Sequence, residues 1–255
     1  MKRSALSIVM VAALVLIGSC PAQSQTEISI IAPGSAKAAL DALIPGFESK
    51  TGYKIKSSGG NGIETKRRVV QGEAFDVPIL QSPLEDVIAS GNVVVGTQTV
   101  LATMPVFVAV RKGAAKPDIS TAEAVKRMFL AARAVSYPGA ALGAGVGISI
   151  DESLKKLGIF EQVQAKSKQT RTGGAAMALA ASGEVEVALT FLNEISDTGV
   201  EVVGPLPLEV STPTALVGFV STHAKDPAAS KAFLEYVSSP YRAAIYTAHG
   251  YKPGH

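Results

Sequence analysis

Hydrophobic positions along the chain switch between two spacings. Short runs of β-branched and other apolar residues predict strands, as in EISIIAP (27–33), YKIKSS (53–58) and FDVPIL (75–80). Segments with a helical spacing follow them at 36–52, 62–72 and 83–91, and all three end in glycine, as many helices do. Strand–helix alternation of this kind is typical of a parallel sheet covered by helices on both faces.

The middle of the chain carries a longer apolar run and then repeats the alternation. The run TVLATMPVFVAVRKG (99–113) is long for one strand, and Pro105 predicts a bend or a change of sheet. The next helix is expected to begin with a capping box of Ser120 and Glu123. The remaining segments include strands at 134–138 and 185–192, helices at 148–158 and 173–183, an apolar run at 213–222 and helices from 226 onward. Two α/β halves joined by two extended crossings predict a two-lobed protein with a cleft.

The N-terminal segment has the layout of a secretory signal. Lys2 and Arg3 precede the uncharged apolar stretch ALSIVMVAALVLIG (5–18), which is short for a transmembrane span. We expect residues 1–24 to be a signal peptide that is cleaved before Gln25. The single cysteine, Cys20, follows Ile-Gly-Ser as in a bacterial lipoprotein signal, so a lipid on Cys20 is the alternative. Both alternatives predict export to the periplasm.

Charge and chemistry-bearing residues narrow the classes of function. Loss of residues 1–24 removes two basic residues and no acidic one, so the formal net charge falls from +3 to +1, with 22 Lys and Arg against 21 Asp and Glu. A nearly neutral chain whose one basic run is Lys66-Arg67-Arg68 is not expected to bind nucleic acid. The three histidines fall in the last segments and no second cysteine exists, so we expect no metal site and no cofactor.

Four local patterns and the order of the segments carry a family resemblance. The patterns are APGSAKAALDALIPGFESKTGYKI (32–55), GGNGIETKRRVVQGEAFDVPILQ (59–81), KPDISTAEAVKRMFLAARAVSYP (116–138) and GVEVVGPLPLEV (199–210). The chain resembles periplasmic solute-binding proteins of the type II fold, and most of all the molybdate-binding branch of ABC transporter receptors. The resemblance implies an α/β protein of two lobes, each a mainly parallel sheet flanked by helices, with two hinge crossings. Lobe I would comprise residues 25–107 and 202–255, and lobe II residues 108–201.

The resemblance also implies where a ligand would lie, namely at four turns. Backbone amides at such turns suit an anion, although the second turn lacks the pair of serines usual in molybdate binders. The expected ligand-binding residues are Ser35, Asn61, Gly62, Tyr137, Gly145, Gly147, Thr190 and Phe191, with Gln81 and Ser82 further out. Each also has a structural interpretation: Ser35 as a helix cap, Asn61 as a left-handed turn residue and the glycine loop as a plain connection.

Two functions remain open on this evidence. The resemblance implies a non-catalytic, monomeric receptor that captures a small anion, either a molybdate-like oxyanion or a small carboxylate, for an ABC permease. The same segments also resemble periplasmic aconitate isomerases, which implies allylic proton transfer on a tricarboxylate. Glu64 or Glu194 would then be the base and Tyr137 the acid. No arginine is fixed by sequence in the four turns, so a trianion would be poorly paired, and we favour the receptor.

Overall fold

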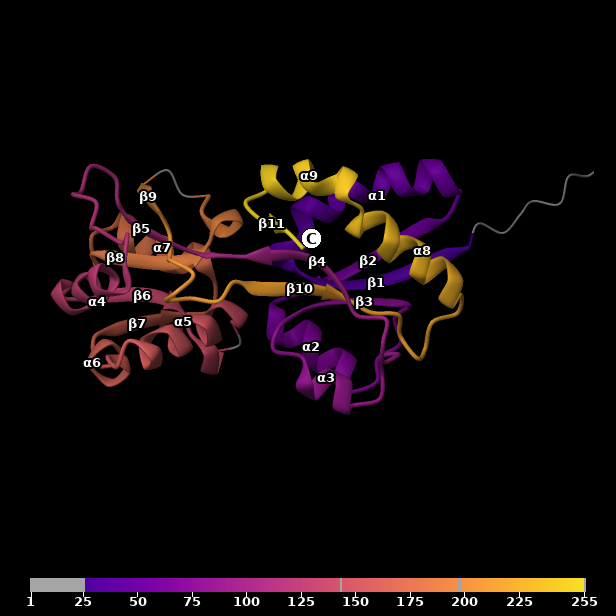
Figure 1. Ribbon diagram of the computed structural model, residues 1–255, viewed down its shortest axis with the longest axis horizontal. Coiled ribbons are helices and arrows are strands. Elements are labelled where there is room, and N and C mark those ends of the chain that lie inside the picture. The colour runs from indigo at the N-terminus through magenta and orange to yellow at the C-terminus, as the bar shows by residue number, and fades with distance from the viewer. Residues whose placement is uncertain (1–25, 143, 197–198, 255) are drawn as a thin grey trace, which may run out of the picture.

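The structure is a computed structural model that describes residues 26–142, 144–196 and 199–254. The expected signal peptide and Cys20 lie outside the described residues. Two lobes lie side by side along the long axis of the molecule, each with its own sheet and helices (Figure 1). Within the described ranges, no helix has the length and apolar character needed to cross a membrane.

Lobe I is built on a six-stranded sheet of order β11-β4-β10-β3-β1-β2. Its strands are β1 (Glu27–Pro33), β2 (Lys54–Gly60), β3 (Val77–Gln81), β4 (Thr99–Met104), β10 (Thr214–Gly218) and β11 (Lys252–Pro253). The first three strands are parallel, whereas β10 pairs antiparallel with β3 and β4. Strand β11 closes the edge antiparallel to β4.

Helices cover both faces of this sheet (Figure 1). On one face lie α1 (Lys37–Thr51), α8 (Pro227–Ser238) and α9 (Ala243–Ala248), and on the other α2 (Gly62–Val70) and α3 (Glu85–Ala89). Alternate residues of β1 serve the two faces, because Ile28 and Ile30 join the core under α1 and α8 while Ile31 joins the core under α2 and α3. The apolar run of β1 thus reflects a strand buried on both sides.

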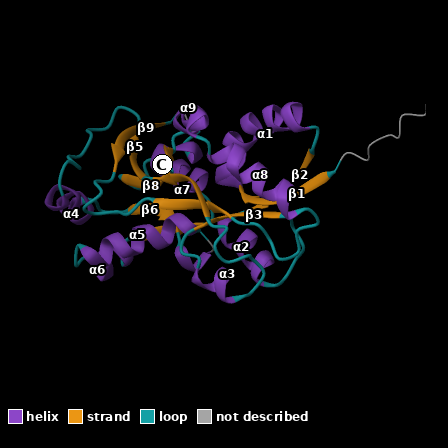
Figure 2. Ribbon diagram, turned by 45° about the vertical axis from the view of Figure 1, so that its right-hand side comes forward, coloured by secondary structure: helices purple, strands orange, loops and turns teal. Residues whose placement is uncertain are grey.

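Lobe II has a five-stranded sheet of order β7-β6-β8-β5-β9. Its strands are β5 (Val106–Arg111), β6 (Val135–Pro138), β7 (Ser167–Thr170), β8 (Val187–Phe191) and β9 (Val200–Pro205). Its helices are α4 (Ala122–Ala131), α5 (Gly145–Lys156), α6 (Phe160–Gln164) and α7 (Gly173–Ala181). Figure 2 shows the same two helix-flanked sheets from a turned view. Short 3₁₀ turns complete the chain at Gly34–Ala36, Ala140–Leu142, Leu192–Glu194 and Pro240–Arg242.

The chain crosses between the sheets twice. Strand β4 ends at Met104 and β5 begins at Val106, so the change of sheet that we expected at Pro105 is confirmed. The return lies between Pro205 and Thr214, the ends of β9 and β10. Two parallel pairings occur in each sheet and the other pairings are antiparallel, so both sheets are mixed rather than mainly parallel. The reason is that β10 in lobe I and β5 in lobe II run against the strands of the βα units, and each is paired on both sides with strands that run the other way.

Two details of the helix starts differ from the expectations. The cap of α4 is Thr121, whose hydroxyl accepts the N–H of Ala124 at 3.2 Å, so the Ser120 capping box was wrong by one residue. Asn61 has φ −72° and ψ 165°, an extended conformation rather than the left-handed one considered above. Its side chain caps α2 instead.

Candidate functional site

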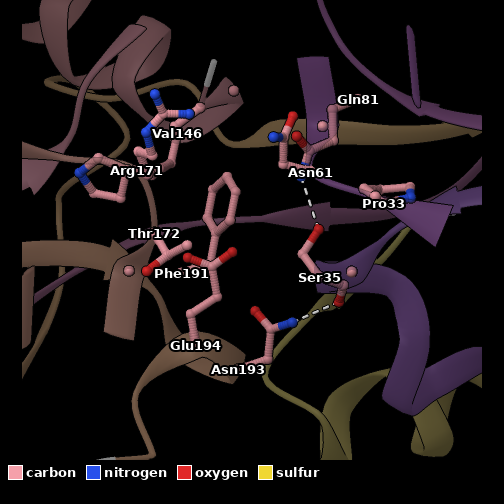
Figure 3. Close-up of a pocket in the computed structure, with 17 residues that line it drawn as sticks. Pro33, Ser35, Asn61, Gln81, Val146, Arg171, Thr172, Phe191, Asn193 and Glu194 are labelled. Carbon is pink, nitrogen blue, oxygen red and sulfur yellow. Dashed lines mark hydrogen bonds between the residues drawn. The ribbon is translucent and has the colours of Figure 1, made fainter. Parts of the chain in front are cut away.

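A cavity of about 290 Å³ lies between the lobes, and segments of both form its wall. This volume suits a small solute. Figure 3 shows the side chains of lobe I on one side and those of lobe II on the other. The lining residues are Pro33, Gly34, Ser35, Gly60, Asn61, Gly62 and Gln81 from lobe I, and Pro138, Ala144, Gly145, Val146, Arg171, Thr172, Gly173, Phe191, Asn193 and Glu194 from lobe II.

The lobe I wall is uncharged and offers hydrogen-bond donors. Gln81, at the end of β3, donates its Nε2 to Ser35 Oγ at 2.8 Å (Figure 3). Because Ser35 Oγ accepts this bond, its own proton is left to donate elsewhere. Asn61 Oδ1 accepts the N–H of Glu64 at 2.8 Å, so the amide nitrogen of Asn61 stays available at the start of α2. Ser35 lies inside a 3₁₀ turn and caps no helix with its hydroxyl, which corrects the expectation that it caps one.

The lobe II wall contains the start of α5, where Gly145 and Val146 line the cavity. No side chain caps this helix, and its first amides precede the first hydrogen bond within the helix. A Cβ on Gly145 would lie 2.4 Å from Gln81 Oε1, and one on Gly62 would lie 2.2 Å from the same atom. The two glycines therefore make room for the Gln81 carboxamide between α2 and α5.

Glu194 places a carboxyl group in the same cavity. Thr190 Oγ1 donates to its Oε2 at 2.6 Å, and the N–H of Gly173 also donates to the carboxyl. Burial nevertheless raises the pKa of Glu194 above its usual value, since it outweighs these two hydrogen bonds. A carboxyl group of this kind accepts a hydrogen bond or a proton when ionised and donates one when protonated.

Sequence reasoning missed three polar side chains of the lining, Arg171, Thr172 and Asn193. Arg171 is exposed and brings a guanidinium with five N–H donors. Thr172 caps α7 by accepting the N–H of Ala175 at 3.3 Å. Arg171 lies outside the four expected turns and reaches the cavity from the end of β7, a segment that the sequence patterns did not identify as a strand.

Asn193 spans the gap between the lobes. Its Nδ2 donates to the backbone oxygen of Ser35 at 2.5 Å and contacts Tyr251 Oη at 3.2 Å (Figure 3 shows the first bond). Tyr251 Oη donates to the same Ser35 oxygen. The turn that carries Ser35 is therefore held from lobe II and from the C-terminal segment at once.

Five of the predicted site residues do not line the cavity, among them the outer candidate Ser82, whose hydroxyl accepts the N–H of Ala215 at 3.0 Å. Tyr137 is buried, and its hydroxyl is hydrogen-bonded to Asp151 at 3.2 Å and Gln164 at 2.8 Å; burial raises the pKa of Tyr137 to about 12. Gly147 packs against the loop after β6, and Thr190 acts behind Glu194. Glu64 is exposed on α2. Ser35, Asn61, Gly62, Gly145, Phe191 and Glu194 do come together there, with Gln81.

No cluster of three or more His, Cys, Asp or Glu side chains that could hold a metal occurs in the described ranges. The site therefore consists of hydroxyl, amide and backbone donors, one guanidinium and one carboxyl group.

Comparisons with known proteins agree with this architecture. An aconitate isomerase from a Pseudomonas species is 27% identical over 248 residues, which cover 93% of each chain. The periplasmic molybdate-binding protein of Azotobacter vinelandii superimposes with a TM-score of 0.68 at 18% identity, over 88% of this chain and 98% of the other. The sulfate-binding protein SubI of Mycobacterium tuberculosis H37Rv gives a TM-score of 0.71 at 18% identity, over 90% and 87%.

The structural neighbours share the two-lobed fold, as expected for the type II class of periplasmic solute-binding proteins. The family model described as bacterial extracellular solute-binding protein matches residues 28–252. This match covers both sheets and both crossings, and with it the chain belongs to the bacterial extracellular solute-binding protein family.

Proposed function

We propose that this protein is a periplasmic receptor that captures a small anion between its lobes and delivers it to an ABC permease. The observation that carries the proposal is the cavity, in which the donors of Ser35 and Asn61 in lobe I face Arg171 and the start of α5 in lobe II across the gap. Helix starts and a guanidinium attract negative charge, and a volume near 290 Å³ limits the ligand to a small one. The relatives named for molybdate and sulfate support the class of ligand.

A thermal-shift screen tests this proposal. The panel contains molybdate, tungstate, sulfate, phosphate and di- and tricarboxylates, because a solute that binds only the folded protein raises its Tm. Small-angle scattering with the best solute should show a smaller radius of gyration, since the cavity lies between two lobes that are joined by two crossings and can close by hinging. Failure of every anion to raise Tm contradicts the receptor function, and an unchanged radius with confirmed binding contradicts lobe closure.

A second candidate is an isomerase that moves an allylic proton of a carboxylate, with Glu194 as the base. The specific support is that the Glu194 carboxyl group lies in the same cavity as the donors that suit an anion, together with the relative named as an aconitate isomerase. Proton NMR of trans-aconitate incubated with the protein tests it by the appearance of the cis isomer. Glu194→Gln should abolish that signal if Glu194 is the base, and Glu64→Gln should leave it unchanged because Glu64 lies outside the cavity.

A further inference from the structure

The cavity wall holds one group that does not suit a fully deprotonated anion, the carboxyl group of Glu194. In Figure 3 this group points from the lobe II turn into the space between the lobes. An ionised carboxylate has about four acceptor positions and no donor. Thr190 Oγ1 and the Gly173 N–H fill two of them from behind. The rest are left for a ligand.

The surroundings of Glu194 leave its charge without a direct counter-ion. Arg171 lines the same cavity, but Glu194 forms no ion pair with it or with any other described residue. The lobe I side of the cavity has no charged side chain at all. Tyr251, whose pKa is raised by burial and then by the charge of Glu194, directs its hydroxyl to the Ser35 carbonyl oxygen instead.

The start of α7 is also occupied by this carboxyl group. A Cβ on Gly173 would lie 2.3 Å from Glu194 Oε2, so the absence of a side chain there lets the carboxyl group approach the helix. A helix start attracts anions, and here the protein supplies its own. A ligand oxygen with a full negative charge at this point would meet a like charge, whereas a ligand O–H would meet an acceptor.

We propose that Glu194 selects, among small anions, those that carry an O–H donor next to the anionic group. This inference rests on the proposed receptor function. Asn61, the amides of α5 and Arg171 bind the anionic part, and Glu194 accepts a hydrogen bond from the hydroxyl. The ligand class is a protonated oxyanion or a hydroxycarboxylate, and fully deprotonated sulfate and molybdate are rejected by charge repulsion and by the missing donor.

Calorimetric titration at pH 8 with two matched pairs of probes tests the proposal. Hydrogen phosphate and sulfate are tetrahedral dianions that differ in one O–H, and malate and succinate are dicarboxylates that differ in one hydroxyl. The pair that binds shows whether the ligand is a tetrahedral oxyanion or a carboxylate. In that pair we expect the wild-type protein to bind the O–H-bearing member at least about tenfold more tightly, roughly 1.4 kcal/mol.

Glu194→Gln should reduce that ratio to about one. The glutamine oxygen still accepts the bonds from Thr190 and Gly173, and its Nε2 presents a donor where the ligand needs an acceptor. Glu64→Gln, the same change on an exposed side chain outside the cavity, is the matched control and should keep the wild-type ratio. The Tm of each variant is measured without ligand. Glu194→Asp, which withdraws the carboxyl group by one methylene, is a second variant if the first one does not fold.

Each outcome decides something. Equal affinities of the wild type for the two members of a binding pair overturn the selection by Glu194. So does a ratio that survives Glu194→Gln, or Glu194→Asp where the first variant does not fold. If none of the four probes and no other anion binds, the receptor function itself fails. Binding without a preference for the O–H leaves that function standing and removes only this inference.

Discussion

Two glycines in the first turn of α5, Gly145 and Gly147, are expected to respond differently to the addition of one methyl group. A Cβ on Gly147 would lie 2.3 Å from the backbone oxygen of Pro138 and 2.4 Å from the backbone nitrogen of Ala140. Ordinary contact begins near 3.4 Å, so the helix or the loop must move by about 1.1 Å (3.4 − 2.3). A Cβ on Gly145 would meet only the movable end of the Gln81 side chain.

Gly147→Ala should therefore destabilise the fold. Overpacking against backbone costs about 1–3 kcal/mol, and the better helix propensity of alanine offsets about 0.5–1 kcal/mol of it. A net loss of about 1–2 kcal/mol lowers Tm by about 2–8 °C in a chain of this size. Gly145→Ala should leave Tm nearly unchanged and weaken anion binding about tenfold, because the methyl group displaces Gln81 from Ser35.

Differential scanning fluorimetry without ligand and calorimetry with the anion found in the screen separate the two effects. Gly174→Ala is the control, since no atom lies within 4 Å of the added Cβ. A Gly147→Ala protein that melts like the wild type would refute the close packing of α5 on the loop. Unchanged affinity in Gly145→Ala would refute the role of that glycine at the cavity.

Three further substitutions test the capping and electrostatic arguments. Thr121→Ala should cost about 1 kcal/mol in urea unfolding and Thr121→Ser much less, since only the hydroxyl caps α4; equal losses would contradict the cap. Burial alone would raise the pKa of Asp76, but hydrogen bonds from Ser29 and Lys225 hold this pKa below its usual value, so the stabilisation is present above the usual Asp pKa and is lost as the pH falls through the lowered pKa. Asp76→Asn should therefore cost about 1–3 kcal/mol at pH 7 and flatten the pH dependence of the free energy of unfolding between pH 2 and 5; a dependence like that of the wild type would refute this. The raised pKa of Glu194 gives the opposite pH dependence: the folded protein binds the proton more tightly, so its stability falls as the pH rises from the usual Glu pKa through the raised one. The stability of Glu194→Gln relative to the wild type should therefore be higher at pH 8 than at pH 4, and denaturant titrations that find no such difference would contradict this.

The sequence predicted the fold well because its pattern records burial. The apolar residues of β1 and β3 serve two helix layers, and such doubly buried strands are visible as β-branched runs. The candidate site residues came from the family resemblance, and three of them, Asn61, Gly62 and Gly145, line the cavity where a strand or loop gives way to a helix. These junctions follow from local signals.

Two residues show where such reasoning ends. Strand β7 is Ser-Lys-Gln-Thr, four residues without apolar alternation, so no pattern indicates that Arg171 follows a strand and reaches the cavity. Tyr137 lies in β6, all four residues of which are buried, and a strand covered on both faces does not reveal which face a side chain takes. Its hydroxyl joins Asp151 inside lobe II instead of facing the ligand.

The position of β10 has a consequence for the order in which the chain folds. Leu216 of β10 pairs with Gln81 of β3 on one side and with Ala102 of β4 on the other, so a late segment fills the gap between two early ones. Lobe II is continuous from Val106 to Pro205 and has all its strands before β10 is synthesised. Lobe I has to wait for the last quarter of the chain, with β3 and β4 exposed at their edges until then. A nascent chain that stops early would leave a finished lobe II beside an open sheet, a species prone to aggregate.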